Sequence, residues 1–146
     1  MKAKSIKGKS TEEIKAALEQ SMADARPDDP VGRGFKPTLA ICFISVALDR
    51  TAITAMLDEE NIAVFGCTTN GEFTDEEPEK GSAAILLLDM NKDHFQIYFE
   101  EYPDGNYREV SVAIAQKAKA KFATPAFLIG TSHMAADGEE ILRGIE

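Results

Sequence analysis

The sequence lacks the features that mark secreted and membrane-spanning proteins. Its two cysteines, Cys42 and Cys67, lie in apolar runs without CxxC spacing, so we expect no structural disulfide and a reducing, cytoplasmic setting. The lysine-rich start of the chain has no apolar core of the kind that a signal peptide needs. The longest apolar runs, such as 83–88, are far shorter than the roughly 20 residues of a membrane span. We therefore expect a soluble cytoplasmic protein that does not contact a membrane.

Positive charge and the common cofactor motifs are also scarce. The 146 residues carry a net charge of -9, and the cations are scattered apart from Lys117, Lys119 and Lys121 on one predicted helix. A nucleic-acid backbone requires clustered Lys and Arg, so we expect no nucleic-acid partner. The sequence has no Walker loop, no G-x-G-x-x-G and no H-E-x-x-H, and its acidic runs lack the spacing of a calcium loop. We expect neither a metal nor a cofactor.

What the sequence does contain is an alternation of strand-like and helix-like segments. Residues 38–45 and 62–67 are almost continuously apolar, as in strands buried on both faces, and a helix is predicted between them over 49–60. Such short strand-helix-strand passages favour parallel crossover units. The apolar run 81–88 and the strict alternation over 95–102 indicate an antiparallel hairpin. We predict a single α/β domain over 1–146, with a mixed, mainly parallel sheet from βαβ units, this hairpin, and helices on both faces.

The remaining segments complete this plan. We predict a weak strand over 2–7 and a final buried strand over 126–130. We also predict three further helices: one from Ser10, which stands in capping-box spacing with Glu13, one over 107–122 and one over 138–146. Residues 26–34 combine proline, glycine and charge, which predicts an exposed, mobile loop. The apolar stripe of the last helix runs to the last residue without a C-cap, so we expect the sequence to be the amino-terminal part of a longer protein.

The strand predicted over 62–67 leads into a loop of short hydrogen-bonding side chains. Ligands usually sit in the loop past the carboxyl end of a parallel strand, so this loop is the first candidate ligand site. The candidate ligand contacts are Cys67, Thr68, Thr69, Asn70, Gly71 and Glu72. Gly71 allows close backbone approach, and Glu72 can accept an ammonium group. The alternative is an ordinary turn, in which Asn70-Gly71 supplies positive backbone angles and the threonines cap neighbouring amides.

A second polar loop, over 130–138, follows the last predicted strand. Its candidate ligand contacts are Thr131, Ser132 and His133. Two polar loops at the carboxyl ends of parallel strands can form a small-molecule cleft, with the second loop opposite the first. The alternative interpretation is that Ser132 or Asp137 only caps the last helix, and the two roles are compatible.

Cys67 also supports a hypothesis of catalysis, as a Cys67-dependent hydrolase or acyltransferase. A nucleophilic thiol needs a base within hydrogen-bond reach, and the chain has only His94 and His133 to offer. His94 falls in the predicted hairpin turn, where we expect it to be solvated, whereas His133 can share a sheet edge with Cys67. The usual fate of such a cysteine is a small, inert, buried residue, so we expect no catalytic residue and no enzyme.

Two short motifs resemble a known family. Residues 65–73, FGCTTNGEF, are similar to the G-C-[ST]-[ST]-x-G-E signature of the FIST N domain, and residues 137–145, DGEEILRGI, to its D-G-x-x-[IL]-L-x-G-[IL] helix start. The resemblance implies a sensory domain of signal-transduction proteins that binds small ligands such as amino acids. It also implies, as a partner, a signalling output protein or a carboxyl-terminal FIST domain. The remaining alternative is a protein-protein interaction module, a homo-oligomer formed through the last helix or an uncovered strand.

Overall fold

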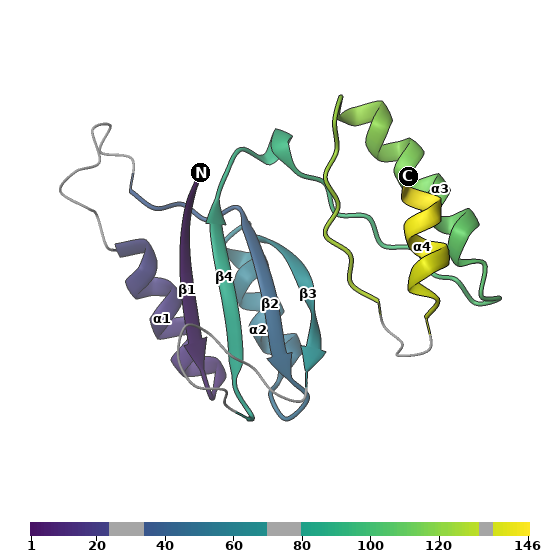
Figure 1. The fold of residues 1–146 in the computed structure, drawn as a ribbon. Helices are drawn as coiled ribbons and strands as arrows, with labels where there is room; N and C mark the ends of the chain where they lie inside the picture. The colour runs from purple at the N-terminus through teal and green to yellow at the C-terminus, as the bar shows by residue number, and fades with distance from the viewer. Residues whose placement is uncertain (24–33, 70–79, 132–135) are drawn as a thin grey trace. The chain divides into compact units, whose positions relative to one another are not determined.

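The structure, a computed structural model, describes residues 1–23, 34–69, 80–131 and 136–146. These residues form two compact units, Met1–Phe95 and Gln96–Glu146. The first unit contains the sheet, two α-helices and a short 3-10 helix, η1 (Lys92–His94), and the second contains two further α-helices (Figure 1). Of the predicted loop 26–34, only Gly34 is among the described residues, so its mobility stays a prediction. No helix in the described ranges has the length and apolar character that a bilayer crossing requires.

The first unit is built on a four-stranded mixed sheet. Its strands are β1 (Lys2–Gly8), β2 (Leu39–Ser45), β3 (Ala63–Thr69) and β4 (Ala83–Asp89), in the order β1-β4-β2-β3. The pair β2 and β3 is parallel, as the apolar runs and the helix between them predicted. However, β4 lies between β1 and β2 and is antiparallel to both, so two of the three pairs are antiparallel. The sheet is mixed as predicted, but parallel pairing does not dominate it.

The predicted hairpin is wrong. The run 81–88 does become a strand, β4, but residues 95–102 form none. The reason is that β1 and β2 occupy both edges of β4, which leaves no edge for a following strand. The predicted last strand, 126–130, is also not formed, and Leu128 and Ile129 are 63% and 43% exposed. Alternating or continuous apolar residues indicate that a segment can form a strand, but they do not show whether a neighbouring strand is available to pair with it.

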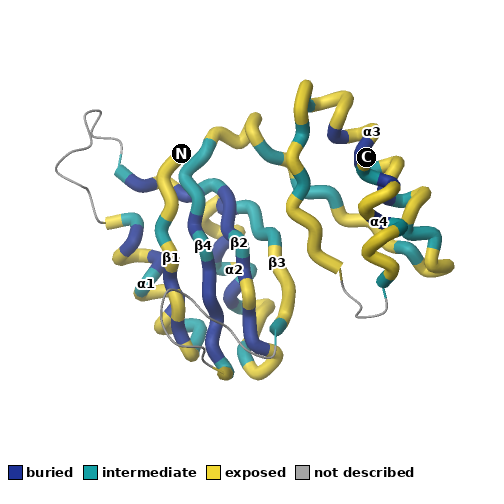
Figure 2. The backbone as a smooth tube through the Cα atoms, viewed as in Figure 1, coloured by how far each residue is buried: buried dark blue, intermediate teal, exposed yellow. Residues whose placement is uncertain are grey.

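Helices α1 (Thr11–Ala23) and α2 (Arg50–Glu59) cover one face of the sheet, where buried positions gather (Figure 2). The helices contribute Ile14, Leu18, Ile53 and Leu57 to this core, and β2 and β4 contribute Ala40, Cys42, Ile44, Ala83, Ile85 and Leu87. The connections β1–α1–β2 and β2–α2–β3 both join strands of the same direction and both advance across the sheet the same way. Right-handed crossovers of this kind place their helices on the same side. The first unit thus has its helices on one face rather than on both.

The start of α1 is as the capping box predicts. The Glu13 amide donates to the Ser10 hydroxyl oxygen at 3.2 Å, and the Glu13 carboxylate accepts from the Lys9 amide at 2.7 Å. These two bonds satisfy amides that the first helical turn would otherwise leave without partners. They fix where α1 begins and therefore how Ile14 and Leu18 meet the sheet.

In the second unit, α3 (Tyr107–Lys121) packs against α4 (Gly138–Ile145). The buried residues of α3 are small, namely Ser111, Ala115 and Ala118. From α4, Ile141 and Gly144 are buried. Small residues on both helices allow the two backbones to approach closely. Asp137 caps α4, since its carboxylate accepts from the amides of Glu139 and Glu140, each at 3.1 Å.

Candidate functional site

The described part of the first candidate loop lies at the carboxyl end of the parallel pair β2 and β3. In the register of this pair, Cys67 lies beside Phe43 and Thr69 beside Ser45. Because β3 is an edge strand, the side chains of Cys67 and Thr68 are exposed, and Thr69 is half-buried. The structure therefore places these three predicted contacts at an accessible edge of the sheet, where ligands of such sheets usually sit.

The predicted contacts of β3 point in two directions. Successive side chains of a strand alternate between the two faces of the sheet. Thr68 shares the face of its neighbour Ile44, which packs in the core under the helices, whereas Cys67 and Thr69 share the opposite face with Phe43. Phe43 is 46% exposed although it belongs to an inner strand, so this opposite face is accessible next to Cys67. The sequence could not distinguish these two directions without the register.

Ser45 is a residue at this edge that the sequence analysis missed. It is buried, its amide donates to the Ser82 carbonyl oxygen at 2.9 Å, and its hydroxyl oxygen accepts from the Ala47 amide at 3.3 Å. The next amide, that of Val46, donates to the Thr69 carbonyl oxygen at 3.3 Å. These bonds tie the turn after β2 to the ends of β3 and β4. Ser45 could have been identified from the sequence because it is the last residue of the apolar run 38–45 and lies beside the end of the next parallel strand.

Gly66 has a steric role in this edge. A Cβ at this position would overlap the carbonyl oxygen of Cys42 and lie 2.8 Å from its carbonyl carbon. Any side chain here would therefore push β3 away from β2. The glycine that precedes the candidate site lets the two strands pair at that point.

The two cysteines differ in environment. Cys42 is buried under the helices, and burial raises the pKa of its thiol to about 12, so it stays protonated at neutral pH. Cys67 is exposed on the edge strand. Within the described ranges, no side-chain base forms a hydrogen bond with the Cys67 thiol. His94 follows β4, which ends beside Leu39 at the amino end of β2, whereas Cys67 lies near the carboxyl end.

The comparison with protein families settles the affiliation of the chain. The model of the FIST N domain matches residues 38–146, which include both motifs, 65–73 and 137–145. The chain belongs to the FIST N domain family. No curated protein and no solved structure matches it. The FIST N domain is a sensory domain of signal transduction, so this is the general role of the chain. The match begins directly before β2, so β1 and α1 precede the matched part.

The remaining predicted contacts of this FIST N domain are described only in part. Thr131 is exposed and belongs to the second unit. The other predicted contacts, Asn70, Gly71, Glu72, Ser132 and His133, lie outside the described residues. The predicted cleft between the two loops is therefore still a prediction. In the part of the chain that the structure describes, no three His, Cys, Asp or Glu side chains gather in a way that can hold a metal ion.

Proposed function

We propose that this FIST N domain binds a small zwitterionic ligand, such as an amino acid, in the loop that begins at the end of β3. The observation that carries the proposal is the accessible polar end of β3 inside the segment that the family model matches. There the side chains of Cys67 and Thr68 are exposed next to a turn fixed by Ser45. Short hydroxyl and thiol groups at a fixed strand end suit polar recognition of a small molecule.

The proposed contacts divide according to the charge and polarity of such a ligand. The carboxylate of Glu72 takes the ammonium group, since opposite charges attract and a carboxylate accepts hydrogen bonds from it. Thr68, Thr69 and Asn70 supply donors and acceptors, and Gly71 leaves room for the ligand near the backbone. Thr131, Ser132 and His133 are the further proposed ligand contacts.

We further propose that binding occurs without catalysis, and that the domain passes its signal to an output protein or a carboxyl-terminal FIST domain in the cytoplasm. A cysteine nucleophile needs a base within hydrogen-bond distance of its sulfur. The described residues offer no such base to Cys67, and His94 follows a strand that ends at the other end of the sheet. This arrangement favours a binding role for Cys67 over a hydrolase or acyltransferase role. Assembly into homo-oligomers is a further prediction that sedimentation can test.

The test is calorimetric titration of the chain with each of the common amino acids, together with thermal unfolding in their presence. We expect heat and an upward shift of the melting temperature with at least one of them. Absence of both with every amino acid refutes the proposed ligand class. Release of product from ester or thioester substrates, lost in Cys67→Ser, refutes the absence of catalysis.

Two substitutions locate the site on β3. Thr68→Val removes one hydroxyl at constant volume, and Cys67→Ala removes the thiol from the opposite face of the sheet. Loss of one hydrogen bond weakens binding by roughly two- to tenfold, so at least one variant should lose affinity by this factor. Thr51→Val, at an exposed position of α2, is the matched control. Equal affinity in all three variants contradicts a site at the end of β3.

A further inference from the structure

The strand β3 lies at one edge of the sheet, and among the described strands it pairs only with β2. The Ala63 amide donates to the carbonyl oxygen of the residue just before β2, at 3.0 Å, and the Thr69 carbonyl oxygen accepts from the amide just after β2, at 3.3 Å. Both residues therefore direct these groups toward the β2 side. Backbone groups alternate between the two sides of a strand, so Val64, Gly66 and Thr68 direct their N–H and C=O groups outward.

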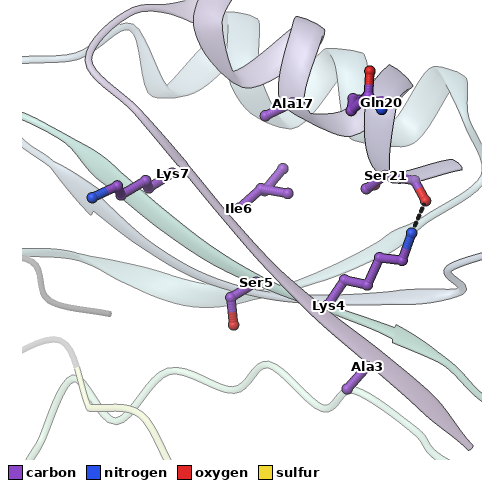
Figure 3. Close-up of a pocket in the computed structure, with 8 residues that line it drawn as sticks. All are labelled: Ala3, Lys4, Ser5, Ile6, Lys7, Ala17, Gln20 and Ser21. Atoms are coloured by element: carbon purple, nitrogen blue, oxygen red, sulfur yellow. Dashed lines mark hydrogen bonds between the residues drawn. The ribbon is translucent and has the colours of Figure 1, made fainter. Parts of the chain in front are cut away.

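This edge strand has no charged side chain, in contrast to the strand at the other edge of the described sheet. The sequence of β3 is AVFGCTT. In contrast, β1 carries Lys2, Lys4 and Lys7, and Figure 3 shows Lys4 beside α1, where it donates to the Ser21 carbonyl oxygen. Lysines on an edge strand discourage its pairing with other chains. Of the two edges of the described sheet, only the one formed by β3 lacks this protection.

The register of β2 and β3 places apolar side chains beside this edge. On the face of the sheet opposite α1 and α2, Phe43 lies beside Cys67 and Ile41 beside Phe65. Phe43 is 46% exposed although β2 is an inner strand. If a second β3 runs antiparallel beside the first, with Gly66 opposite its own copy, Phe65 lies opposite the Cys67 of the other copy. The apolar row then continues across the new pair and covers part of this exposed surface.

We propose that the chain forms a symmetric dimer in which β3 of one copy pairs antiparallel with β3 of a second copy, with Gly66 at the two-fold axis. Val64 then lies opposite Thr68 of the other copy, and their outward backbone groups exchange both hydrogen bonds, as do those of the two Gly66 residues. A second copy suits this edge because no like charges meet across the pair and a two-fold axis closes the assembly. This interface rests on the homo-oligomer included in the proposed function and does not require ligand binding.

Sedimentation velocity over a concentration series, under reducing conditions, tests whether backbone bonds of β3 hold the dimer. We expect a concentration-dependent dimer that Thr68→Ala retains, because alanine keeps the outward N–H. Thr68→Pro removes this N–H from each copy but leaves the bonds to β2, so it should weaken the dimer by roughly five- to hundredfold. A monomer at every concentration overturns the homo-oligomer together with this interface. A dimer of equal strength in Thr68→Pro overturns the interface alone.

Disulfide formation tests the register without requiring that the strand tolerate proline. Phe65→Cys places a thiol opposite Cys67 of the other copy, at a pair whose Cα atoms lie about 4.5 Å apart and within the range of a disulfide. Ala63→Cys adds a thiol on the same face, but about 7 to 8 Å from that Cys67. After mild oxidation, Phe65→Cys should give at least about fivefold more covalent dimer than Ala63→Cys or the unchanged chain. Equal amounts of covalent dimer in the three proteins overturn the proposal.

Discussion

Gly144 and Gly138 provide a matched test of how α4 is held in the second unit. Both glycines belong to α4, but their surroundings differ. A Cβ on Gly144 would lie 2.6 Å from the Arg108 carbonyl oxygen and 2.6 Å from the Ser111 Cβ, both on α3. Optimal separations for such atom pairs are about 3.5 to 4.0 Å, so α4 would have to move by about 1 Å. A Cβ on Gly138 would meet nothing within 4 Å.

The two substitutions by alanine should therefore have opposite signs. Alanine gains about 0.5 to 1 kcal/mol over glycine inside a helix, because it restricts the unfolded chain. At Gly138 only this gain applies, and at the first helical position it should be about 0.5 kcal/mol or less. At Gly144 the overlap with α3 costs about 1 to 3 kcal/mol. With the gain subtracted, Gly144→Ala should thus destabilise the second unit by up to about 2.5 kcal/mol.

The measurement is native-state hydrogen exchange at the amides of Ala115 and Ala118, which lie on the buried side of α3. Exchange there reports the opening of the second unit without requiring that the whole chain unfold in one step. Faster exchange in Gly144→Ala and unchanged or slower exchange in Gly138→Ala are expected. Equal stabilisation by both substitutions would show that α3 and α4 do not pack at Gly144.

Three further predictions concern the cysteines, the pairing of β2 with β3, and the α4 cap. At pH 8 a thiol reagent should modify Cys67 but not Cys42 in the native protein. Reaction of both thiols at equal rates would contradict this difference. Burial raises the pKa of the Cys42 thiol from 9.0 to about 12. Its contribution to the free energy of unfolding is therefore complete below pH 9 and is lost between pH 9 and 12. Gly66→Ala should increase amide exchange in β3 more than in β4, as measured by NMR, because its Cβ would overlap the Cys42 backbone; unchanged exchange would refute the close approach. Asp137→Ala should destabilise α4 by about 1 kcal/mol, while Asp137→Asn should retain most of the cap; in denaturant unfolding, equal losses in both would argue against the cap.

Local patterns predicted the elements of the first unit well. The capping residues Ser10 and Glu13 placed the start of α1, and the apolar runs placed β2 and β3 and their parallel pairing. These features depend on neighbours in the sequence, such as the period of apolar residues and the first turn of a helix. The position of β4 depends instead on its pairing with β1 and β2, which are distant from it in the sequence.

The same distinction applies to the candidate site. The sequence predicted that the strand ends at Cys67 and that Thr68 and Thr69 lie in the loop after it, whereas all three residues belong to β3 at the edge of the sheet. It did not identify Ser45, because its role comes from bonds to Ser82 and Ala47, which depend on the neighbouring strand and the turn. It also did not show that Cys67 and Thr68 face opposite sides, since direction follows from the register against Phe43 and Ile44.

The central position of β4 has a consequence for the order in which the sheet can assemble during synthesis. When residues 1–69 have left the ribosome, β2 and β3 can pair, but β1 has no partner, because Ile6 pairs with Ile85 and Cys42 also pairs with Ile85 from the other side. The strand that joins the two halves of the sheet is thus the last one to be made. Contacts this distant along the chain slow folding and leave early strands exposed in the meantime. For the nascent chain, the lysines of β1 discourage pairing with other chains until β4 has been made.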